Sequence, residues 1–197
     1  MIGSGEDAEA FHVKMDAIKE KPYFSADNLG FLTSTGNTFE FKQPCLKQMD
    51  PEDFILVIEY LESGQFGQQV VENDDDRQRM LAQCGAAWGV AERLGMVDLL
   101  EHIVNKLNHA IPWEPEEVLI LAELVYITPA ALSLQAHEDM KDMLSNFVAR
   151  NFDDYIINHR RAFLATTAAR LEFKADVHEK VAVLARMELE DEENQDV

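Results

Sequence analysis

Histidine is the residue type in this chain best suited to bind a metal, and the sequence holds six of them. Zinc sites use His, Cys or carboxylate ligands, and two ligands on one helix are usually three or four residues apart. His102 and His109 are seven residues apart and could share a helix face, but no Cys, Asp or Glu completes a tetrahedral set with them. We expect no metal site, and we predict surface or partly buried side chains for His12, His102, His109, His137, His159 and His178.

Ser4 is the serine whose surroundings most resemble those of a nucleophile, because a glycine stands on each side of it. A hydrolase serine commonly lies on a sharp turn with the pattern G-x-S-x-G, and a dinucleotide site needs G-x-G-x-x-G between a strand and a helix. Residues 3–5 (GSG) match neither pattern. Gly-Ser-Gly is ordinary turn chemistry, so we interpret this segment as a turn between strands.

An acidic run, residues 72–76 (ENDDD), carries the oxygen ligands that Ca²⁺ prefers. An EF-hand loop also needs a central glycine and a closing glutamate, and both are missing here. We interpret the run as a solvated loop that caps a helix beginning at Arg77. A carboxylate pair for glycoside hydrolysis would need a sugar cleft, to which nothing in the sequence points. The sequence therefore predicts a protein that is not an enzyme and that uses no cofactor.

The composition indicates which partners to expect. The chain has 197 residues and a net charge of −20, from 37 acids and 17 bases. A nucleic-acid binder usually shows a basic stripe, and none is visible, so we expect no nucleic-acid partner. No apolar run approaches the roughly 18 residues of a membrane span, and the N-terminus lacks a signal-peptide pattern. Cys45 and Cys84 form no CxxC pair, which favours reduced thiols and a location in the cytoplasm or nucleus.

Helical patterns fill most of the chain after residue 50. Asp50, Pro51 and Gly64 have the residue types of a helix cap, a first helical position and a helix stop. Short strands are expected near residues 8–14 and 38–42. We interpret the methionines of the C-terminal helices as core residues: Met140, Met143 and Met187. A helix from residue 77 is expected to turn one face inward: Met80, Leu81, Cys84, Ala87, Trp88, Ala91 and Leu94. Further helices are expected from residue 98, from residue 115 and over residues 134–152, 161–173 and 176–189.

Three segments, in the right order, resemble the BTB/POZ family. Its members typically have a strand ending in F-x-V-H-K and then S-x-Y-F, and this chain has FHVKM at 11–15 and PYF at 22–24. The family stretch P-E-x-F-x-x-x-L-x-Y-L-Y-T-G is similar to residues 51–64 (PEDFILVIEYLESG). The stretch L-x-x-A-D-K-L-G-M-x-x-L is similar to residues 87–99 (AWGVAERLGMVDL). Residues 1–110 thus resemble a BTB/POZ domain of the fungal type that carries a C-terminal helical extension.

The resemblance implies two protein-binding regions. BTB relatives dimerise through their first helix, so the implied dimer interface contains Met15 and Ile18. The strand that many BTB dimers exchange is almost absent here, which predicts a weak homodimer. Two copies of charge −20 repel one another, so the dimer is expected to tighten as salt screens this repulsion. Relatives that recruit a ubiquitin-ligase cullin often carry a hydrophobic-x-Glu motif. Phe31, Leu32 and Thr33 stand at that place, with Thr33 in the position of the Glu, so cullin binding is expected to be weak or absent.

The predicted fold is α+β. A small BTB/POZ-like sheet flanked by a helical cluster is expected over residues 1–110, an all-α extension over 111–187 and an acidic disordered tail over 188–197. The predicted function is that of a protein–protein interaction module that forms a homodimer and binds a partner protein. The alternatives are a substrate adaptor for a cullin-type ubiquitin ligase, a nuclear scaffold or transcription cofactor, and an enzyme of unknown chemistry.

Overall fold

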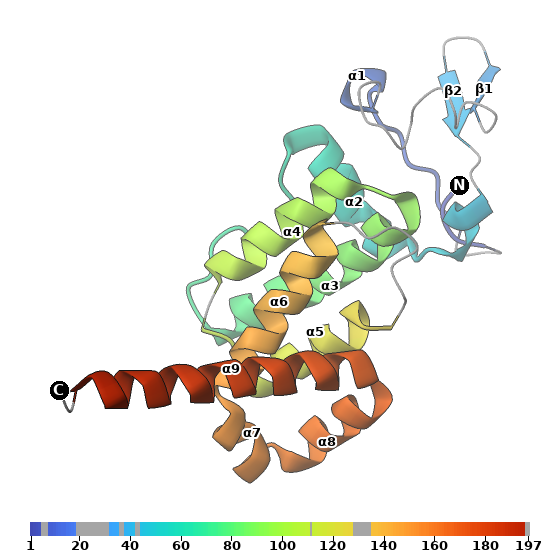
Figure 1. The fold of residues 1–197 in the computed structure, drawn as a ribbon. Coiled ribbons are helices and arrows are strands. Elements are labelled where there is room, and N and C mark those ends of the chain that lie inside the picture. The colour runs from blue at the N-terminus through green and yellow to red at the C-terminus, as the bar shows by residue number, and fades with distance from the viewer. Residues whose placement is uncertain are drawn as a thin grey trace. The chain divides into compact units, whose positions relative to one another are not determined.

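The structure of the chain is a computed structural model that forms two compact units (Figure 1). Unit 1 is Met1–Leu107 and unit 2 is Asn108–Val197. The structure describes residues 1–4, 8–18, 32–35, 38–41, 44–110, 112–127 and 135–195. It describes the backbone alone for Met15, both strands, Pro44, Cys45, Glu188 and residues 191–195.

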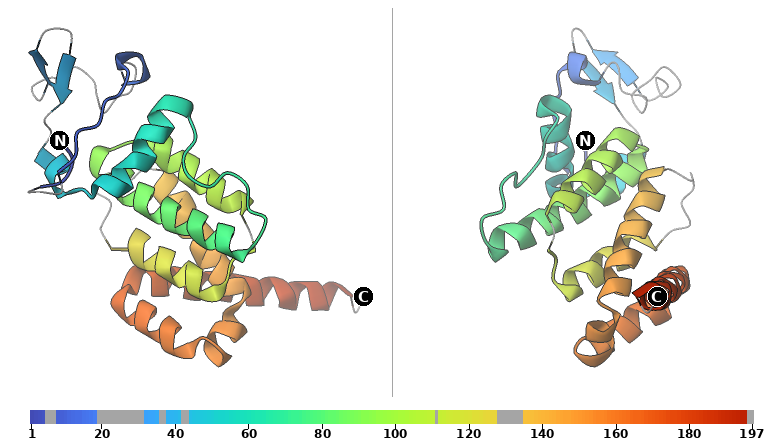
Figure 2. Two further views of the ribbon diagram at one scale, coloured as in Figure 1. Left: turned by 180° about the vertical axis from the view of Figure 1, so that it is seen from behind. Right: turned by 60° about the vertical axis from the view of Figure 1, so that its left-hand side comes forward.

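Three helices form the body of unit 1, and local sequence sets their ends. Asp50 caps α2 (Pro51–Ser63), because its carboxylate accepts a hydrogen bond of 2.9 Å from the Glu52 N–H. Gly64 then ends α2 in the left-handed region, at φ 73°. Asn73 caps α3 (Asp74–Leu94) through the Asp76 N–H, and α4 (Val97–His109) follows at once (Figure 2). The predicted cap and stop of α2 are confirmed.

The core of unit 1 lies on the facing sides of these helices. The side chain of Trp88 is 1% exposed and is the largest fully buried side chain of the described residues. Helix α2 contacts α3 directly. The inward face that the sequence predicts for α3 is confirmed, because every member of it is buried: Met80, Leu81, Cys84, Ala87, Trp88, Ala91 and Leu94.

The loop between α2 and α3 is held against the helices by polar side chains. Phe66 is buried in this loop, and its carbonyl oxygen accepts a hydrogen bond of 2.5 Å from Lys106 Nζ. The same ammonium lies 4.4 Å from the centroid of the Phe66 ring. The Gly67 N–H donates to Glu59 Oε2 at 2.8 Å, and the next N–H of the chain donates to Gln83 Oε1 at 2.7 Å. Helices α2, α3 and α4 therefore each fix one point of the loop.

The predicted α+β class is wrong, because the described residues are almost entirely helical. Their paired backbone amounts to one hairpin, β1 (Leu32–Thr35) with β2 (Thr38–Phe41), and an isolated bridge between Ile2 and Glu9. No third strand joins the hairpin within the described ranges. A two-stranded hairpin offers too little surface to be the layer on which a helical cluster packs.

Unit 2 consists of helices α5 to α9. Glu114 begins α5 (Pro115–Val125), and its N–H donates to Glu117 Oε2 at 2.8 Å. Trp113, 4% exposed, lies with its ring centroid 5.7 Å from that of Phe147. Helix α6 contacts both α5 and α9, and α8 contacts α5. The remaining helices are α6 (Gln135–Arg150), α7 (Phe152–Ile157), α8 (Arg160–Ala169) and α9 (Leu171–Gln195).

Helix α9 differs from the sequence prediction at its C-terminal end. The sequence predicted a helix ending near residue 189 and a disordered tail over 188–197. In the structure α9 continues without a break to Gln195. Within unit 2, its C-terminal half extends beyond α6, α7 and α8 (Figures 1 and 2). The acidic segment is therefore largely the distal part of a 25-residue helix.

Candidate protein-binding surface on helix α9

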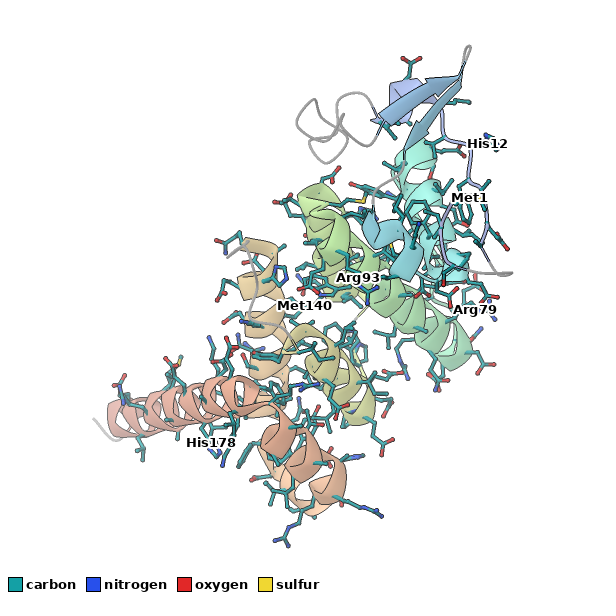
Figure 3. The ribbon with its side chains drawn as sticks, turned by 90° about the vertical axis from the view of Figure 1, so that its right-hand side faces the viewer. Met1, His12, Arg79, Arg93, Met140 and His178 are labelled. Carbon is teal, nitrogen blue, oxygen red and sulfur yellow. The ribbon has the colours of Figure 1, made fainter. Side chains whose placement is uncertain are left out.

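The histidines are spread over both units. Within the described ranges, no group of three His, Cys, Asp or Glu side chains is placed to hold a metal ion. His12 and His178 are exposed (Figure 3), and so is His109. His137 is only 2% exposed, although the sequence predicted a surface or partly buried side chain. No helix among the described residues is both long enough and apolar enough to cross a membrane.

Ile18, one of the two residues of the predicted dimer interface, is half-buried. It lies in α1 (Met15–Ile18), a single helical turn that contacts α2. Nearby in the chain, the ring centroid of Phe11 is 5.4 Å from that of the buried Phe54. The backbone of Met15 belongs to the same turn, and its side chain lies outside the described residues. The structure thus leaves part of Ile18 open to solvent.

The predicted cullin-facing loop falls mostly outside the described side chains. Phe31 is not among the described residues. Leu32 and Thr33 lie in β1, where they are paired with Phe41 and Glu40 of β2. The two positions are therefore part of a hairpin strand.

The proximal part of α9 is anchored by apolar side chains in the core of unit 2. Phe173 and Val177, one turn apart, are fully buried. The ring centroid of Phe173 lies 5.2 Å from that of Tyr126, which follows the end of α5. Apolar residues four apart lie along one face of a helix. This row fixes the side of α9 that faces the core.

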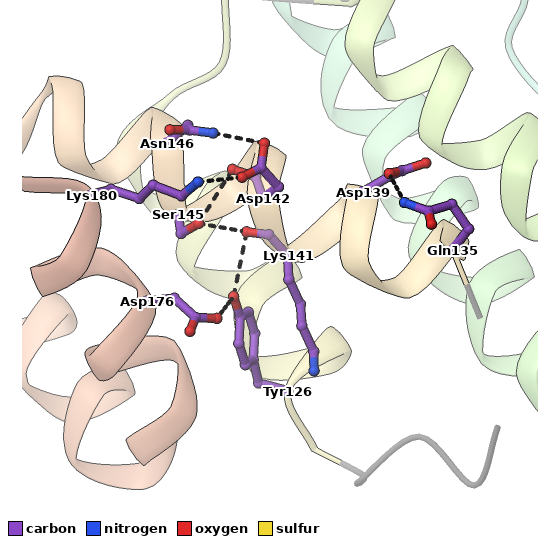
Figure 4. Close-up of polar contacts among 9 residues, drawn as sticks. All are labelled: Tyr126, Gln135, Asp139, Lys141, Asp142, Ser145, Asn146, Asp176 and Lys180. Atoms are coloured by element: carbon purple, nitrogen blue, oxygen red, sulfur yellow. Dashed lines mark hydrogen bonds and ion pairs between the residues drawn. The ribbon is translucent and has the colours of Figure 1, made fainter. Parts of the chain in front are cut away.

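A second row on α9, beside the first, is anchored by polar contacts (Figure 4). Glu172 Oε1 lies 2.6 Å from Lys141 Nζ of α6, and Lys180 Nζ lies 2.5 Å from Asp142 Oδ1 of the same helix. Between them, Asp176 Oδ2 accepts a hydrogen bond of 2.7 Å from the Tyr126 hydroxyl. Three successive turns of α9 are therefore bonded to α6 and to Tyr126 by charged or hydroxyl groups.

Burial shifts the pKa values of two groups in this polar row. Desolvation raises the pKa of the Asp176 carboxyl, while the hydrogen bond from Tyr126 acts in the opposite direction. Desolvation, together with the hydrogen bond to Asp176, raises the pKa of the Tyr126 phenol well above its usual range. The phenol therefore stays protonated at neutral pH and remains the donor in this contact.

Beyond Lys180 the same two rows continue with apolar residues, but they are no longer buried. Val181 and Leu184 are half-buried, and Val183 and Met187 are 44% and 55% exposed. Our interpretation of Met187 as a core residue is wrong, because the other helices of unit 2 end before α9 does. Met140, by contrast, is 1% exposed, and Met143 is half-buried. We call Val181, Val183, Leu184 and Met187 the distal stripe.

The distal stripe has the geometry of a helix-pairing surface. Val177, Val181, Leu184 and Met187 follow one another at spacings of four, three and three residues, which place them along one side of an α-helix. A narrow seam of this kind packs against another helix by ridges and grooves. Of these residues we named only Met187 from the sequence, and we interpreted Met187 as a core residue. The length of the acidic stretch after Met187 was the available signal that the core ends before this point.

Comparison of the chain with protein-family models, curated proteins and solved structures finds no match.

Proposed function

We propose that this chain is a protein-binding module rather than an enzyme, and that the distal stripe of α9 is a surface through which it binds. The observation that carries the proposal is the continuation of a buried apolar row onto exposed surface. Phe173 and Val177 are fully buried, whereas Met187, on the same side of the helix, is 55% exposed. Burying exposed apolar surface is the main source of free energy in protein association.

The resemblance of residues 1–110 to BTB/POZ domains supports the same class of function. This support comes from the order of the three sequence segments alone, and the sheet that the resemblance implied is not part of the proposal. The proposal includes action in the cytoplasm or nucleus, in keeping with the presence of only two cysteines, which form no CxxC pair. Adaptor and scaffold roles remain forms of this proposal that differ only in the partner bound.

Affinity purification from the cell that naturally makes the chain tests the proposal with three baits. The first is the natural chain, the second carries Met187→Asp in the distal stripe, and the third carries Leu189→Asp. Leu189 is 62% exposed and lies two residues further along α9, roughly 200° around the helix from Met187. Both variants add one negative charge at nearly the same position along the axis of α9. We expect partner proteins to be lost from the Met187→Asp bait and kept by the Leu189→Asp bait.

Identical sets of partners on all three baits would show that the distal stripe is not the binding surface. Circular dichroism of both variants provides the folding control. Both side chains are exposed, so helix content and melting temperature are expected to stay close to those of the natural chain.

Self-association is the second part of the proposal, and we expect a reversible, weak homodimer. Two copies that each carry a charge of −20 repel one another, and salt screens this repulsion. The dimer should therefore tighten as ionic strength rises, as measured by sedimentation equilibrium. Ile18→Asp, at the half-buried face of α1, is expected to abolish the dimer with little change in the thermal melt. A chain that stays monomeric in high salt at tens of micromolar contradicts this prediction.

A further inference from the structure

We infer that the distal stripe of α9 binds a cationic amphipathic helix of a partner protein. The inference rests on the proposed function and specifies the chemistry of the partner. Three properties of α9 lead to it: the shape of the stripe, the charges around it and the orientation of the helix.

The shape of the stripe selects a helix. Its apolar residues lie three or four positions apart, so the exposed apolar surface is narrow and runs along the helix axis. An amphipathic helix presents a matching narrow stripe, with anchors at i, i+3, i+4 and i+7. Val181 to Met187 span six residues, or about 9 Å, which corresponds to roughly two turns of a partner helix.

The charges around the stripe select a cationic partner. From residue 179 to the C-terminus the sequence holds seven acids and two bases. One of the bases, Lys180, is already paired with Asp142 of α6. Glu179, which stands on one side of the stripe by helical register, is exposed. Lysine or arginine on the flank of a partner helix would meet this carboxylate across the seam.

The direction of the helix adds to this preference. Peptide dipoles place a partial negative charge at the C-terminal end of a helix, where cations are stabilising and acids are not. In α9 the last ten residues before Asp196 contain one base, Arg186, and five acids. Acidic side chains and the helix dipole are therefore both negative at the C-terminal end of α9, about two turns beyond Met187.

The same charges disfavour a second copy of this chain as the occupant. Two copies of α9 would bring their acidic C-terminal segments together around one apolar seam. Like charges placed opposite one another in an interface are destabilising. Ionic strength distinguishes the two occupants, because salt weakens binding of a cationic helix and strengthens association of two acidic chains.

The test uses the full chain and a designed peptide of about 14 residues, or four turns. The peptide has leucines at the seam positions and lysines on the flanks. A side-chain lactam holds it helical, because isolated helices of this length are marginal in water. A second peptide has the same composition with the leucines scrambled, and a third has glutamate in place of every lysine. Binding is measured by fluorescence anisotropy at low and high salt.

We expect the lysine peptide to bind the natural chain and the Leu189→Asp variant with similar affinity, more weakly as salt rises. Met187→Asp should weaken binding by about tenfold or more, because it places a charge in the buried seam. Met187→Leu keeps an apolar side chain of similar volume and should retain binding. The scrambled and glutamate peptides should bind at least about tenfold more weakly than the lysine peptide.

Four results would overturn the inference. Equal binding of the ordered and scrambled lysine peptides would show charge attraction without an apolar seam. Equal binding by the Met187→Asp and Leu189→Asp variants would place the peptide elsewhere. A homodimer that Met187→Asp abolishes and salt strengthens would identify a second copy as the occupant. If the peptide fails while the Met187→Asp bait still loses natural partners, the proposed function stands and only the cationic partner is rejected.

Discussion

Replacing Trp88 with alanine is expected to lower the free energy of unfolding by about 3–5 kcal/mol. Trp88 lies in the middle of α3, 1% exposed, in the core of unit 1. Removing a buried indole loses its transfer free energy and leaves a cavity that helices fixed at both ends fill only in part. Natural domains are stable by about 5–15 kcal/mol, so the loss is a large fraction of the total. Urea unfolding followed by circular dichroism measures it.

Ile55→Ala is the matched control for Trp88→Ala in unit 1. Ile55 lies on α2 with 42% of its surface exposed, so its truncation is expected to cost about 1 kcal/mol or less. If both variants unfold at the same urea concentration as the natural chain, Trp88 does not belong to the core.

Phe173→Ala is expected to have a similar effect in unit 2, about 3–5 kcal/mol. Phe173 is fully buried, and its ring centroid lies 5.2 Å from that of Tyr126. Tyr126 also donates the hydrogen bond to Asp176, so loss of the Phe173 ring removes packing beside one of the polar contacts that attach α9. Thermal and urea unfolding of the full chain measure the change.

The control for Phe173→Ala lies on the same helix. Leu171 is two residues earlier and 73% exposed, so Leu171→Ala is expected to change stability by about 0.5 kcal/mol or less. A Phe173→Ala chain as stable as the Leu171→Ala chain would mean that α9 is not held by its first apolar row.

Helix ends that depend on local chemistry could be predicted from the sequence. Asp50 and Gly64 act at the ends of α2 as their residue types indicate, because a cap is satisfied by groups within a few residues of it. The inward face of α3 also followed from periodicity. Where two helices meet without a strong cap or stop residue, the sequence did not show the boundary. Residues 134–152 read as one helix, and the structure ends α6 at Arg150 and begins α7 at Phe152.

The sheet was predicted from signals that are weak in isolation. Alternation of apolar and polar residues around Phe11, and the aromatic pair Phe39 and Phe41, favours extended backbone. Whether extended segments join into a sheet depends on partners distant in the sequence, which alternation does not identify. The described part of the chain holds one hairpin and one isolated bridge in place of the predicted sheet.

The candidate surface on α9 could not be predicted either, because a sequence pattern does not show which segments pack together. The spacing of Val181, Leu184 and Met187 is identical for a buried and an exposed helix face. Only the lengths of the neighbouring helices determine where burial ends, and those lengths are a tertiary property. Acid-rich composition likewise favours disorder, yet α9 extends to Gln195 because its proximal half is anchored in the core.

Each unit of the chain contains one buried tryptophan, Trp88 in unit 1 and Trp113 in unit 2, and the sequence has only these two. Indole emission changes when the ring passes from a protein interior to water, so each unit carries its own optical reporter. A Trp113→Phe chain emits from unit 1 alone, and a Trp88→Phe chain from unit 2 alone. Whether the two signals change at the same denaturant concentration decides whether one free energy describes the unfolding of the whole chain.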